Sequence, residues 1–380
     1  MKTVKLYDDS HLYTFGANVI ECIKDGEKYK IVLDKSAFFP MGGGQSGDTG
    51  RIGNAEIFDT RTDNGIIYHY SNSRVDIGEV ICSIDEEPRF RKMQNHSGEH
   101  IFSGIVHNLY GFENVGFHLG DDVTVDFSGE LTGEQLAEVE KLANEAIYKN
   151  ISFVITYPSA DELKTLDYRS KLELTEDVRI VTVDGYDRCA CCAPHVKSSG
   201  EIGMIKILDF SRHRGGTRVH IICGLDALDD YNKKCENLYD IAVKLCARQN
   251  EAADIFSKYV EDVNEIKQKN SELQRELIKL KSEALESSGK NIVFFENTDA
   301  ANLRNIVLET VQRCEGICAG FSGNDNDGYN FAVASNNIDL RIESKEINSA
   351  ICGRGGGSEN LIQGRCKADR KTIEKYFSEV

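Results

Sequence analysis

A long apolar repeat in the second half of the chain constrains the fold most. From Tyr231 to Ala284, sixteen positions recur at strictly alternating spacings of four and three residues, with no proline among them. This heptad pattern predicts a helical segment whose apolar face packs on a partner chain or on a second helix of the same chain. A polar side chain at such a position, here Asn270, often fixes the register. The positions, called here the heptad seam, are Tyr231, Cys235, Leu238, Ala242, Leu245, Gln249, Ala252, Phe256, Tyr259, Val263, Ile266, Asn270, Leu273, Leu277, Leu280 and Ala284.

The parts on either side of the heptad seam differ in pattern, and together they predict an α+β protein of several domains. Residues 1–88 hold short β-branched or aromatic runs, such as 29–34 and 65–70, separated by Gly, Asp and Asn, which is typical of a small β-barrel or sandwich, and we expect the barrel. Residues 89–225 mix the two periodicities and predict an α/β domain. The expected elements there are helices at 94–110 and 132–149 and strands at 151–156, 178–183 and 217–223.

The C-terminal quarter predicts a second, smaller α/β domain. The helical segment, 226–289, ends at a linker-like stretch, 286–289, and residues 290–380 then form the last unit. Its expected elements are a strand at 291–295, a helix at 299–313, a strand at 330–334, and a glycine-rich loop before a final helix.

Charge and hydropathy exclude some classes of protein. The net charge of −17 argues against non-specific nucleic-acid binding, because phosphate contacts need Lys and Arg. No stretch reaches the roughly 18 apolar residues of a membrane span, and the N-terminus turns acidic before a signal-peptide core could form. We therefore expect a cytoplasmic protein without a membrane partner. Twelve cysteines are too sparse for a disulfide scaffold, so clustered ones suggest metal.

Two short motifs carry metal-ligand chemistry. His96 and His100 are four residues apart, so on a helix both rings face one side. Cys191 and His195 lie in a Cys-rich turn, and the four side chains together suit one zinc ion per chain. Cys189 and Cys192 are neighbouring thiols that could replace Cys191. A closed Cys-His₃ site would be structural, whereas a loose ligand would leave room for catalysis.

With both motifs in view, the chain resembles a known family. The spacing of His96, His100, Cys191 and His195 is similar to the zinc motif of the alanyl-tRNA synthetase editing domain. Residues 38–50 resemble that family's glycine-rich motif, and residues 352–358 resemble the glycine-rich loop of the synthetase's C-terminal domain, C-Ala. The order of parts is that of the freestanding AlaX trans-editing proteins in their long form. One departure is that the usual Cys-Gly-Gly-Thr-His reads Cys-Cys-Ala-Pro-His here, with the spacing kept.

The resemblance implies an activity. It indicates a zinc-dependent aminoacyl-tRNA deacylase that hydrolyses mischarged tRNA(Ala), above all Ser-tRNA(Ala) and Gly-tRNA(Ala), with 89–225 as the zinc-binding editing domain. Ser36 and Gln45 flank the glycine motif and are the candidates for substrate chemistry, and Gly42, Gly43 and Gly44 for backbone contact with the substrate. A non-catalytic RNA-binding or assembly protein with a structural zinc, or a metallohydrolase for another ester, remains an alternative.

Two basic clusters are the expected tRNA contacts. Arg212, Arg214 and Arg218 form a local basic run despite the acidic whole, and Arg354, Arg365 and Lys367 surround the C-terminal glycine motif. In the family, C-Ala is associated with tRNA contact and dimerisation. We therefore expect a homodimer formed through the helical segment or the C-terminal domain.

Overall fold

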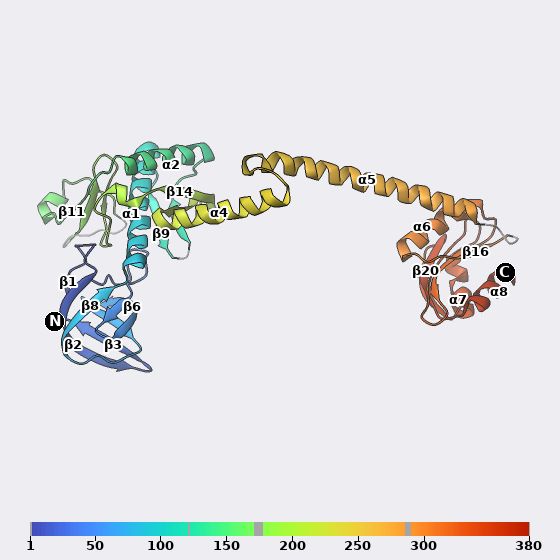
Figure 1. The fold of residues 1–380 in the computed structure, drawn as a ribbon, viewed down its shortest axis with the longest axis horizontal. Helices are drawn as coiled ribbons and strands as arrows, with labels where there is room; N and C mark the ends of the chain where they lie inside the picture. The colour runs from blue at the N-terminus through green and yellow to red at the C-terminus, as the bar shows by residue number, and fades with distance from the viewer. Residues whose placement is uncertain (1, 121, 171–177, 286–289, 380) are drawn as a thin grey trace. The chain divides into compact units, whose positions relative to one another are not determined.

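The structure is a computed structural model that describes residues 2–120, 122–170, 178–285 and 290–379. It contains two compact units, Met1–Asp240 and Ile241–Val380, each described by itself below (Figure 1). The mixed α+β, multidomain class predicted from the sequence is confirmed. The predicted boundaries at residues 88, 225 and 289 stay a prediction, and the expected linker at 286–289 lies outside the described residues.

The first unit begins with the predicted barrel. Six antiparallel strands close on themselves in the order β2-β3-β7-β6-β5-β8. Alternate residues of β2 point inward, and Phe15, Val19 and Ile31 belong to the barrel core. The strands are β2 (Thr14–Asp25), β3 (Lys28–Leu33), β5 (Gly50–Ile52), β6 (Ala55–Asp63), β7 (Ile66–Ser71) and β8 (Gly78–Ile84); the short β1 (Val4–Lys5) and β4 (Lys35–Ser36) pair beside it.

The helix α1 (Glu86–Tyr110) follows the barrel directly and lies at the centre of the first unit (Figure 1). Small residues let its neighbours approach closely, because a Cβ on Gly98 would lie 2.3 Å from the Cys223 sulfur, and one on Gly104 2.3 Å from the Tyr186 carbonyl. As a result, α1 is buried through most of its length.

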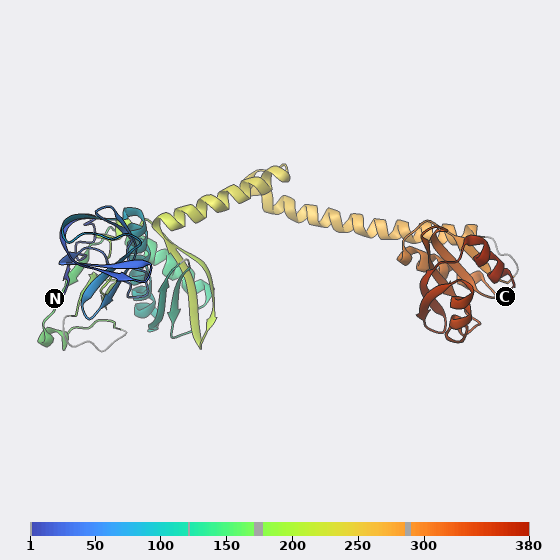
Figure 2. The same cartoon turned by 90° about the horizontal axis from the view of Figure 1, so that it is seen from below.

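Two sheets and a helix pack around α1. One sheet has the order β14-β15-β10-β9, whose long β14–β15 hairpin is yellow-green in Figure 2, and the other has the order β11-β12-β13. The bounds are β9 (Asn114–Leu119), β10 (Val123–Phe127), α2 (Gly133–Tyr148), β11 (Phe153–Thr156), α3 (Ala160–Leu163), β12 (Ile180–Val183), β13 (Asp187–Ala190), β14 (Ile205–His213) and β15 (Gly216–Cys223).

The segment of the heptad seam is two helices, α4 (Gly224–Lys244) and α5 (Ala252–Ala284). The amide of Ala247 donates to the Ala242 carbonyl, and that of Cys246 donates to Val243. Cys246 has a φ of 52°, so α4 ends in a Schellman motif with a non-glycine residue at the left-handed position. The repeat reflects only the spacing of apolar side chains along the sequence, so it does not indicate where such a cap ends the helix.

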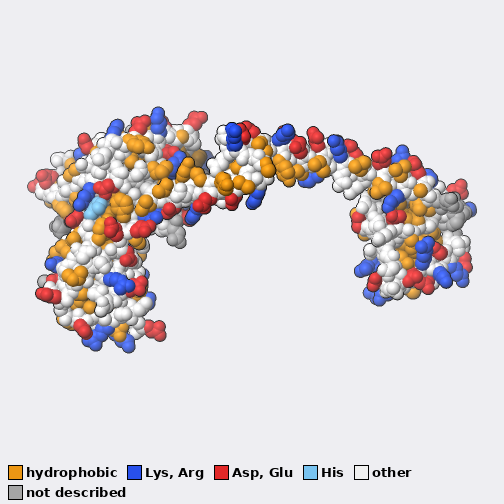
Figure 3. All heavy atoms as spheres, viewed as in Figure 1, with side chains coloured by type: hydrophobic (Ala, Val, Ile, Leu, Met, Phe, Trp, Pro, Cys, Tyr) orange, Lys and Arg blue, Asp and Glu red, His pale blue; other side chains and the backbone are white. Residues whose placement is uncertain are grey.

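Most large apolar side chains of the heptad seam on α5 are exposed (Figure 3). Ile266 is 65% exposed and Leu273 is 63% exposed, whereas a core position of a helix is normally buried. Packing of the seam on a partner chain, and thus a coiled coil, stays a prediction. Within the described residues, no helix combines the length and apolar character needed to cross a membrane.

The second unit contains a five-stranded sheet of order β16-β17-β18-β20-β19, in which only β16 and β17 are parallel. The predicted strand and helix positions hold, but the expected glycine-rich loop is the edge strand β19, because its backbone pairs along β20. The bounds are β16 (Ile292–Phe295), α6 (Ala300–Thr310), β17 (Cys318–Asn324), β18 (Gly328–Ala334), α7 (Leu340–Ala350), β19 (Gly353–Gly357), β20 (Leu361–Cys366) and α8 (Arg370–Glu379).

The two faces of this sheet are covered to different extents. Phe321, Phe331 and Ile362 point to the face covered by α7 and α8. On the opposite face, Cys318 and Ala332 pack against α6. The β20–β19 end of that second face carries exposed residues instead of core, so part of the sheet is open to solvent.

Candidate metal centre and active site

The four predicted ligands meet in the first unit. His96 and His100 lie one turn apart on α1, while Cys191 and His195 lie in the turn that follows β13. One ligand atom from each residue lies within 4.8 Å of the other three. The Cys191 sulfur is 3.5 Å from Nε2 of His96 and 3.4 Å from Nε2 of His195. The motifs are therefore brought together as the sequence predicted.

The donor set and its spacing fit zinc. Zinc binds histidine nitrogen at about 2.0–2.1 Å and thiolate at about 2.3 Å in a tetrahedron, which puts nitrogen and sulfur about 3.5 Å apart. The two sulfur–nitrogen distances in the cluster match that edge. The three histidines are almost completely buried, and Cys191 is partly exposed.

The thiol alternatives are placed differently. Cys189 groups with His100 and Asp187 rather than with all three histidines, and Cys192 is exposed. Burial raises the pKa of Cys189 to about 11. Among the described residues, Cys191 is the thiol that joins the three histidines.

Each histidine of the cluster is held through its other ring nitrogen. Nδ1 of His96 lies 2.9 Å from Oε1 of Gln45, Nδ1 of His100 lies 2.8 Å from Asp187, and Nδ1 of His195 lies 3.1 Å from Ser97. These contacts leave the Nε2 atoms of His96 and His195 directed at the thiol. Partners of this kind fix the tautomer and ring orientation of metal ligands.

The cluster favours an ionised thiol. Burial alone would raise the pKa of Cys191, but the electrostatic influence of the His96 and His195 rings and the hydrogen bond from His100 hold it well below its usual value. Burial alone would likewise lower the pKa of His100, but its bond to Asp187 and the Cys191 thiol raise it well above its usual value. The thiolate is the form that binds metals.

The glycine motif forms a tight turn against this cluster. Gly42 and Gln45 exchange both backbone hydrogen bonds, and Gly43 and Gly44 between them have φ values of 62° and 84°. A Cβ on Gly44 would lie 2.5 Å from the Phe117 carbonyl, so only glycine fits there. The turn sets Gln45 beside His96. The Nε2 amide of Gln45 is buried and has no hydrogen-bond partner among the described residues.

The other candidate, Ser36, lies inside the barrel. It is fully buried, and its hydroxyl donates to Nε2 of His69, whose Nδ1 donates to the Ile31 carbonyl. Burial lowers the pKa of His69 to about 4, so this ring is neutral. No hydrogen bond in the described structure joins Ser36 to the cluster, so the structure does not bring it together with Gln45.

Sequence reasoning missed the charged residues that hold these parts in place. Arg89 and Asp48 form a fully buried ion pair, and the same guanidinium donates to the Ala37 and Ser10 carbonyls. Asp48 also accepts from the Phe39 amide. The pair thereby joins the glycine motif to the start of α1. Asp48 belongs to the glycine motif and could therefore be located from the sequence, whereas its partner Arg89 could not.

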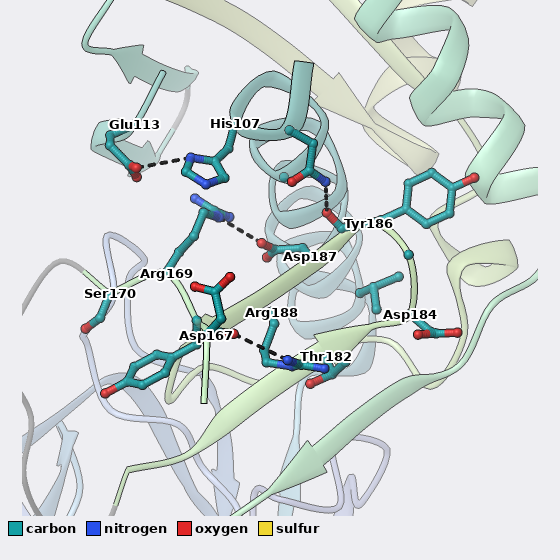
Figure 4. Close-up of a pocket in the computed structure, with 15 residues that line it drawn as sticks. His107, Glu113, Asp167, Arg169, Ser170, Thr182, Asp184, Tyr186, Asp187 and Arg188 are labelled. Carbon is teal, nitrogen blue, oxygen red and sulfur yellow. Dashed lines mark hydrogen bonds and ion pairs between the residues drawn. The ribbon is translucent and has the colours of Figure 1, made fainter. Parts of the chain in front are cut away.

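A polar cavity is lined in part by Asp187, the carboxylate that holds His100 (Figure 4). It has a volume of about 450 Å³, and Arg169 and Asp187 point toward one another in its wall. Its lining includes His107, Arg188 and Asp184. Basic and acidic side chains alternate around it, so the cavity has no strong preference of charge.

The two predicted tRNA-binding clusters are built differently. Arg218 binds both oxygens of Asp126, and Arg212 contacts Glu130. Arg214 lies at the exposed turn between β14 and β15 with a φ of 49°. Two of the three arginines of this run are therefore already paired with carboxylates.

In the second unit, Arg354 and Arg365 stand directly opposite each other on β19 and β20. Both are exposed, as is Lys367, and within the described ranges no carboxylate is paired with any of the three. Like charges in direct register destabilise a sheet. An arrangement that places them there without a counter-charge suits an external anion.

Comparison with known proteins places the chain among editing domains. Residues 178–220 match the family model described as the threonyl and alanyl tRNA synthetase second additional domain. The chain is 27% identical to the alanyl-tRNA editing protein AlaX-L of Pyrococcus horikoshii, covering 97% of this chain and 95% of that protein. It is 25% identical to the alanyl-tRNA editing protein Aarsd1 of Danio rerio, covering 96% of this chain and 94% of that protein.

A longer relative matches only in part. The alanine–tRNA ligase of Methanopyrus kandleri is 27% identical over 94% of this chain, but the match spans 42% of the ligase. Together these findings confirm the resemblance to the AlaX family of alanyl-tRNA editing proteins, in its long form, that the motifs indicated.

Proposed function

We propose that this protein is a trans-editing hydrolase that deacylates mischarged tRNA(Ala), with Ser-tRNA(Ala) and Gly-tRNA(Ala) as its main substrates. Two full-length relatives that bear the name alanyl-tRNA editing protein support it. The observation that carries it is local: a four-ligand zinc-type cluster beside the buried Gln45 amide, which has an unused donor in the described structure.

The reaction needs little from the protein beyond positioning. Water adds to the ester carbonyl, the bond to the terminal ribose oxygen breaks, and the proton passes to that oxygen. Zinc held by His96, His100, Cys191 and His195 would supply a Lewis acid for the water or carbonyl, or a holder for the α-amine, where one of the four ligands gives up its position to the substrate or water. Nε2 of Gln45 would donate to the oxygen on which negative charge develops.

Discrimination against alanine requires a group that pairs with the serine hydroxyl. A polar group left unpaired by alanine penalises that substrate, because a buried unsatisfied group is costly. The backbone of the Gly42–Gly44 turn is the candidate for contact with the substrate, whereas Ser36, the other sequence candidate, already pairs with His69 inside the barrel.

The direct test is hydrolysis of Ser-, Gly- and Ala-tRNA(Ala), with and without a zinc chelator. We expect hydrolysis of the first two, little of the third, and loss on chelation. Gln45→Glu sharpens the test, because it keeps an oxygen for His96 and removes the Nε2 donor. We expect zinc to stay and kcat to fall by about 10²–10³-fold, as for loss of one oxyanion donor.

Gln94→Glu is the matched control. Gln94 is 4% exposed, close to the 3% of Gln45, but its amide is already used by the Glu201 carbonyl and the Leu225 amide. Its variant should keep kcat close to that of the unmodified protein. A protein that binds zinc and tRNA yet hydrolyses none of the three substrates would support the alternative, a non-catalytic RNA-binding protein with a structural zinc.

The same proposal includes tRNA contact through the arginines of both units. Arg354, Arg365 and Lys367 are exposed and unpaired in the described structure, and they are proposed as the stronger phosphate contacts. Arg212, Arg214 and Arg218 are proposed as contacts near the editing domain.

We also propose a homodimer through the exposed heptad seam of α5. Burying side chains such as Leu273 and Leu277, which are 63% and 52% exposed, would stabilise a paired helix. Light scattering should report roughly twice 42.4 kDa. Leu273→Glu with Leu277→Glu should give monomer, whereas Lys269→Glu, which lies off the seam, should not. A monomeric unmodified protein would contradict this and favour packing within one chain.

A further inference from the structure

The three histidines of the cluster differ in the charge of the group that holds them. His96 is held by the neutral amide of Gln45 and His195 by the neutral hydroxyl of Ser97, but His100 donates to the carboxylate of Asp187. Hydrogen bonds to an ionised group are roughly twice as strong as those between neutral groups. His100 is therefore the most firmly held of the three rings.

Both oxygens of Asp187 are committed. Oδ2 accepts from Nδ1 of His100 at 2.8 Å, and Oδ1 accepts from Nε of Arg169 at 2.8 Å. The Asp187 side chain is 1% exposed, so these two contacts fix its plane without help from bulk water. The carboxylate thus links the metal helix α1 to strand β13, at whose first residue it lies.

Arg169 is itself fixed by the backbone. Its amide donates to the Arg188 carbonyl at 2.8 Å, and its carbonyl accepts from the Ala190 amide at 2.9 Å, which ties it along β13. Its guanidinium lies in the wall of the polar cavity, pointing at Asp187 (Figure 4). The arginine therefore holds the carboxylate from a rigid position.

We propose that Asp187, anchored by Arg169, is the positioning residue of the metal centre, setting the tautomer and orientation of His100 so that its Nε2 faces the ion. This inference rests on the proposed zinc site and adds residues that contact neither metal nor substrate. Outer carboxylates of this kind typically contribute 10–100-fold to metal affinity. The two donors facing Asp187 require two acceptor oxygens, which only a carboxylate supplies.

The test is zinc affinity, measured by competition with a chromogenic chelator. Asp187→Asn keeps the shape but offers one acceptor oxygen to two donors, so zinc should bind about 10–100-fold more weakly. Asp126→Asn is the matched control, because Asp126 is a largely buried partner of Arg218 that touches no cluster histidine. Its zinc affinity should equal that of the unmodified protein.

The outcomes separate this inference from the proposed function. Equal zinc affinity in Asp187→Asn and the unmodified protein would overturn the inference and leave the editing proposal intact. An unmodified protein that binds no zinc would overturn the zinc centre and this inference together. Should Asp187→Asn fail to fold, Asp187→Glu decides: it moves both oxygens by one methylene, so affinity should fall, and unchanged affinity would overturn the positioning role.

Discussion

The two units of this protein differ in where their basic side chains lie and in whether these side chains have partners. All nine histidines lie in the first unit, where those of the cluster are buried and bonded to named partners. The second unit has no histidine, and its arginines on β19 and β20 are exposed side by side. The difference supports the proposal that the first unit carries out the chemistry and that the second contacts the tRNA.

Removing a ligand should have the largest effect and should be confined to the first unit. His100→Ala should lose most of the zinc and nearly all deacylation while tRNA binding persists, because the arginines of β19 and β20 are untouched. Metal analysis measures the zinc content, and filter binding measures the binding of tRNA. His107→Ala is the control, since His107 lies on the same helix but pairs with Glu113 outside the cluster. Full zinc content in His100→Ala would remove His100 from the ligand set.

Mild acid should also separate the units. Burial lowers the pKa of His69 to about 4 from its ordinary 6.5, so between these values the unfolded chain binds a proton that the folded barrel excludes. The stability that neutral His69 supplies is therefore complete above about pH 6.5 and falls as pH drops toward 4, by about 3 kcal/mol.

Thermal unfolding followed from pH 7 to pH 4 checks this point. The transition of the first unit should move down while that of the second, without histidine, serves as internal reference. His69→Gln should flatten the dependence of the first transition on pH. An unchanged slope in this variant would mean that other groups govern the acid response.

The charged sheet of the second unit should govern binding more than turnover. Arg354→Ser with Arg365→Ser should raise KM and make the salt dependence of tRNA binding shallower by about two units or less, because each arginine neutralises at most one phosphate. The kcat should stay within a few-fold, because the cluster is unchanged. Loss of activity at saturating tRNA would instead give this sheet a part in the chemistry.

The matching change in the first unit should have the smallest effect. Arg212→Ser with Arg218→Ser removes the same charge, but both arginines already pair with Glu130 and Asp126. An arginine must leave its carboxylate before it binds a phosphate, so we expect a smaller change in the salt slope than in the other pair. An equal or larger change would reverse the comparison between the two units.

Much of the candidate metal centre could be predicted from the sequence, because the spacing of the ligands within each motif is a local property. The four-residue steps of His96–His100 and Cys191–His195 needed only a helix and a turn to place each pair on one side. The barrel and most strands followed from short-range alternation. Gln45 could also be found from the sequence, because it directly follows the three glycines of the glycine motif.

Two features of the fold could not be predicted from local sequence patterns. The heptad repeat continues through the end of α4, because spacing of apolar side chains does not record the left-handed conformation of Cys246. The glycines at 353–357 suggested a loop, but pairing with β20 makes them a strand, and strand pairing depends on a distant segment.

What the sequence by itself determined was the set of candidate metal ligands, the order of the barrel and helical parts, and the resemblance to a family. Only the tertiary structure decided which partner each charged group meets. Asp187 lies 87 residues from His100, and Arg89 lies 41 residues from Asp48, so no periodicity connects them. Burial forces such groups to find partners, since an unpaired buried charge is costly, but the partner is chosen by the fold. In the same way, Arg212 and Arg218 on β14 and β15 have carboxylate partners, whereas Arg354 and Arg365 on β19 and β20 have none in the described structure, and only the fold decides this.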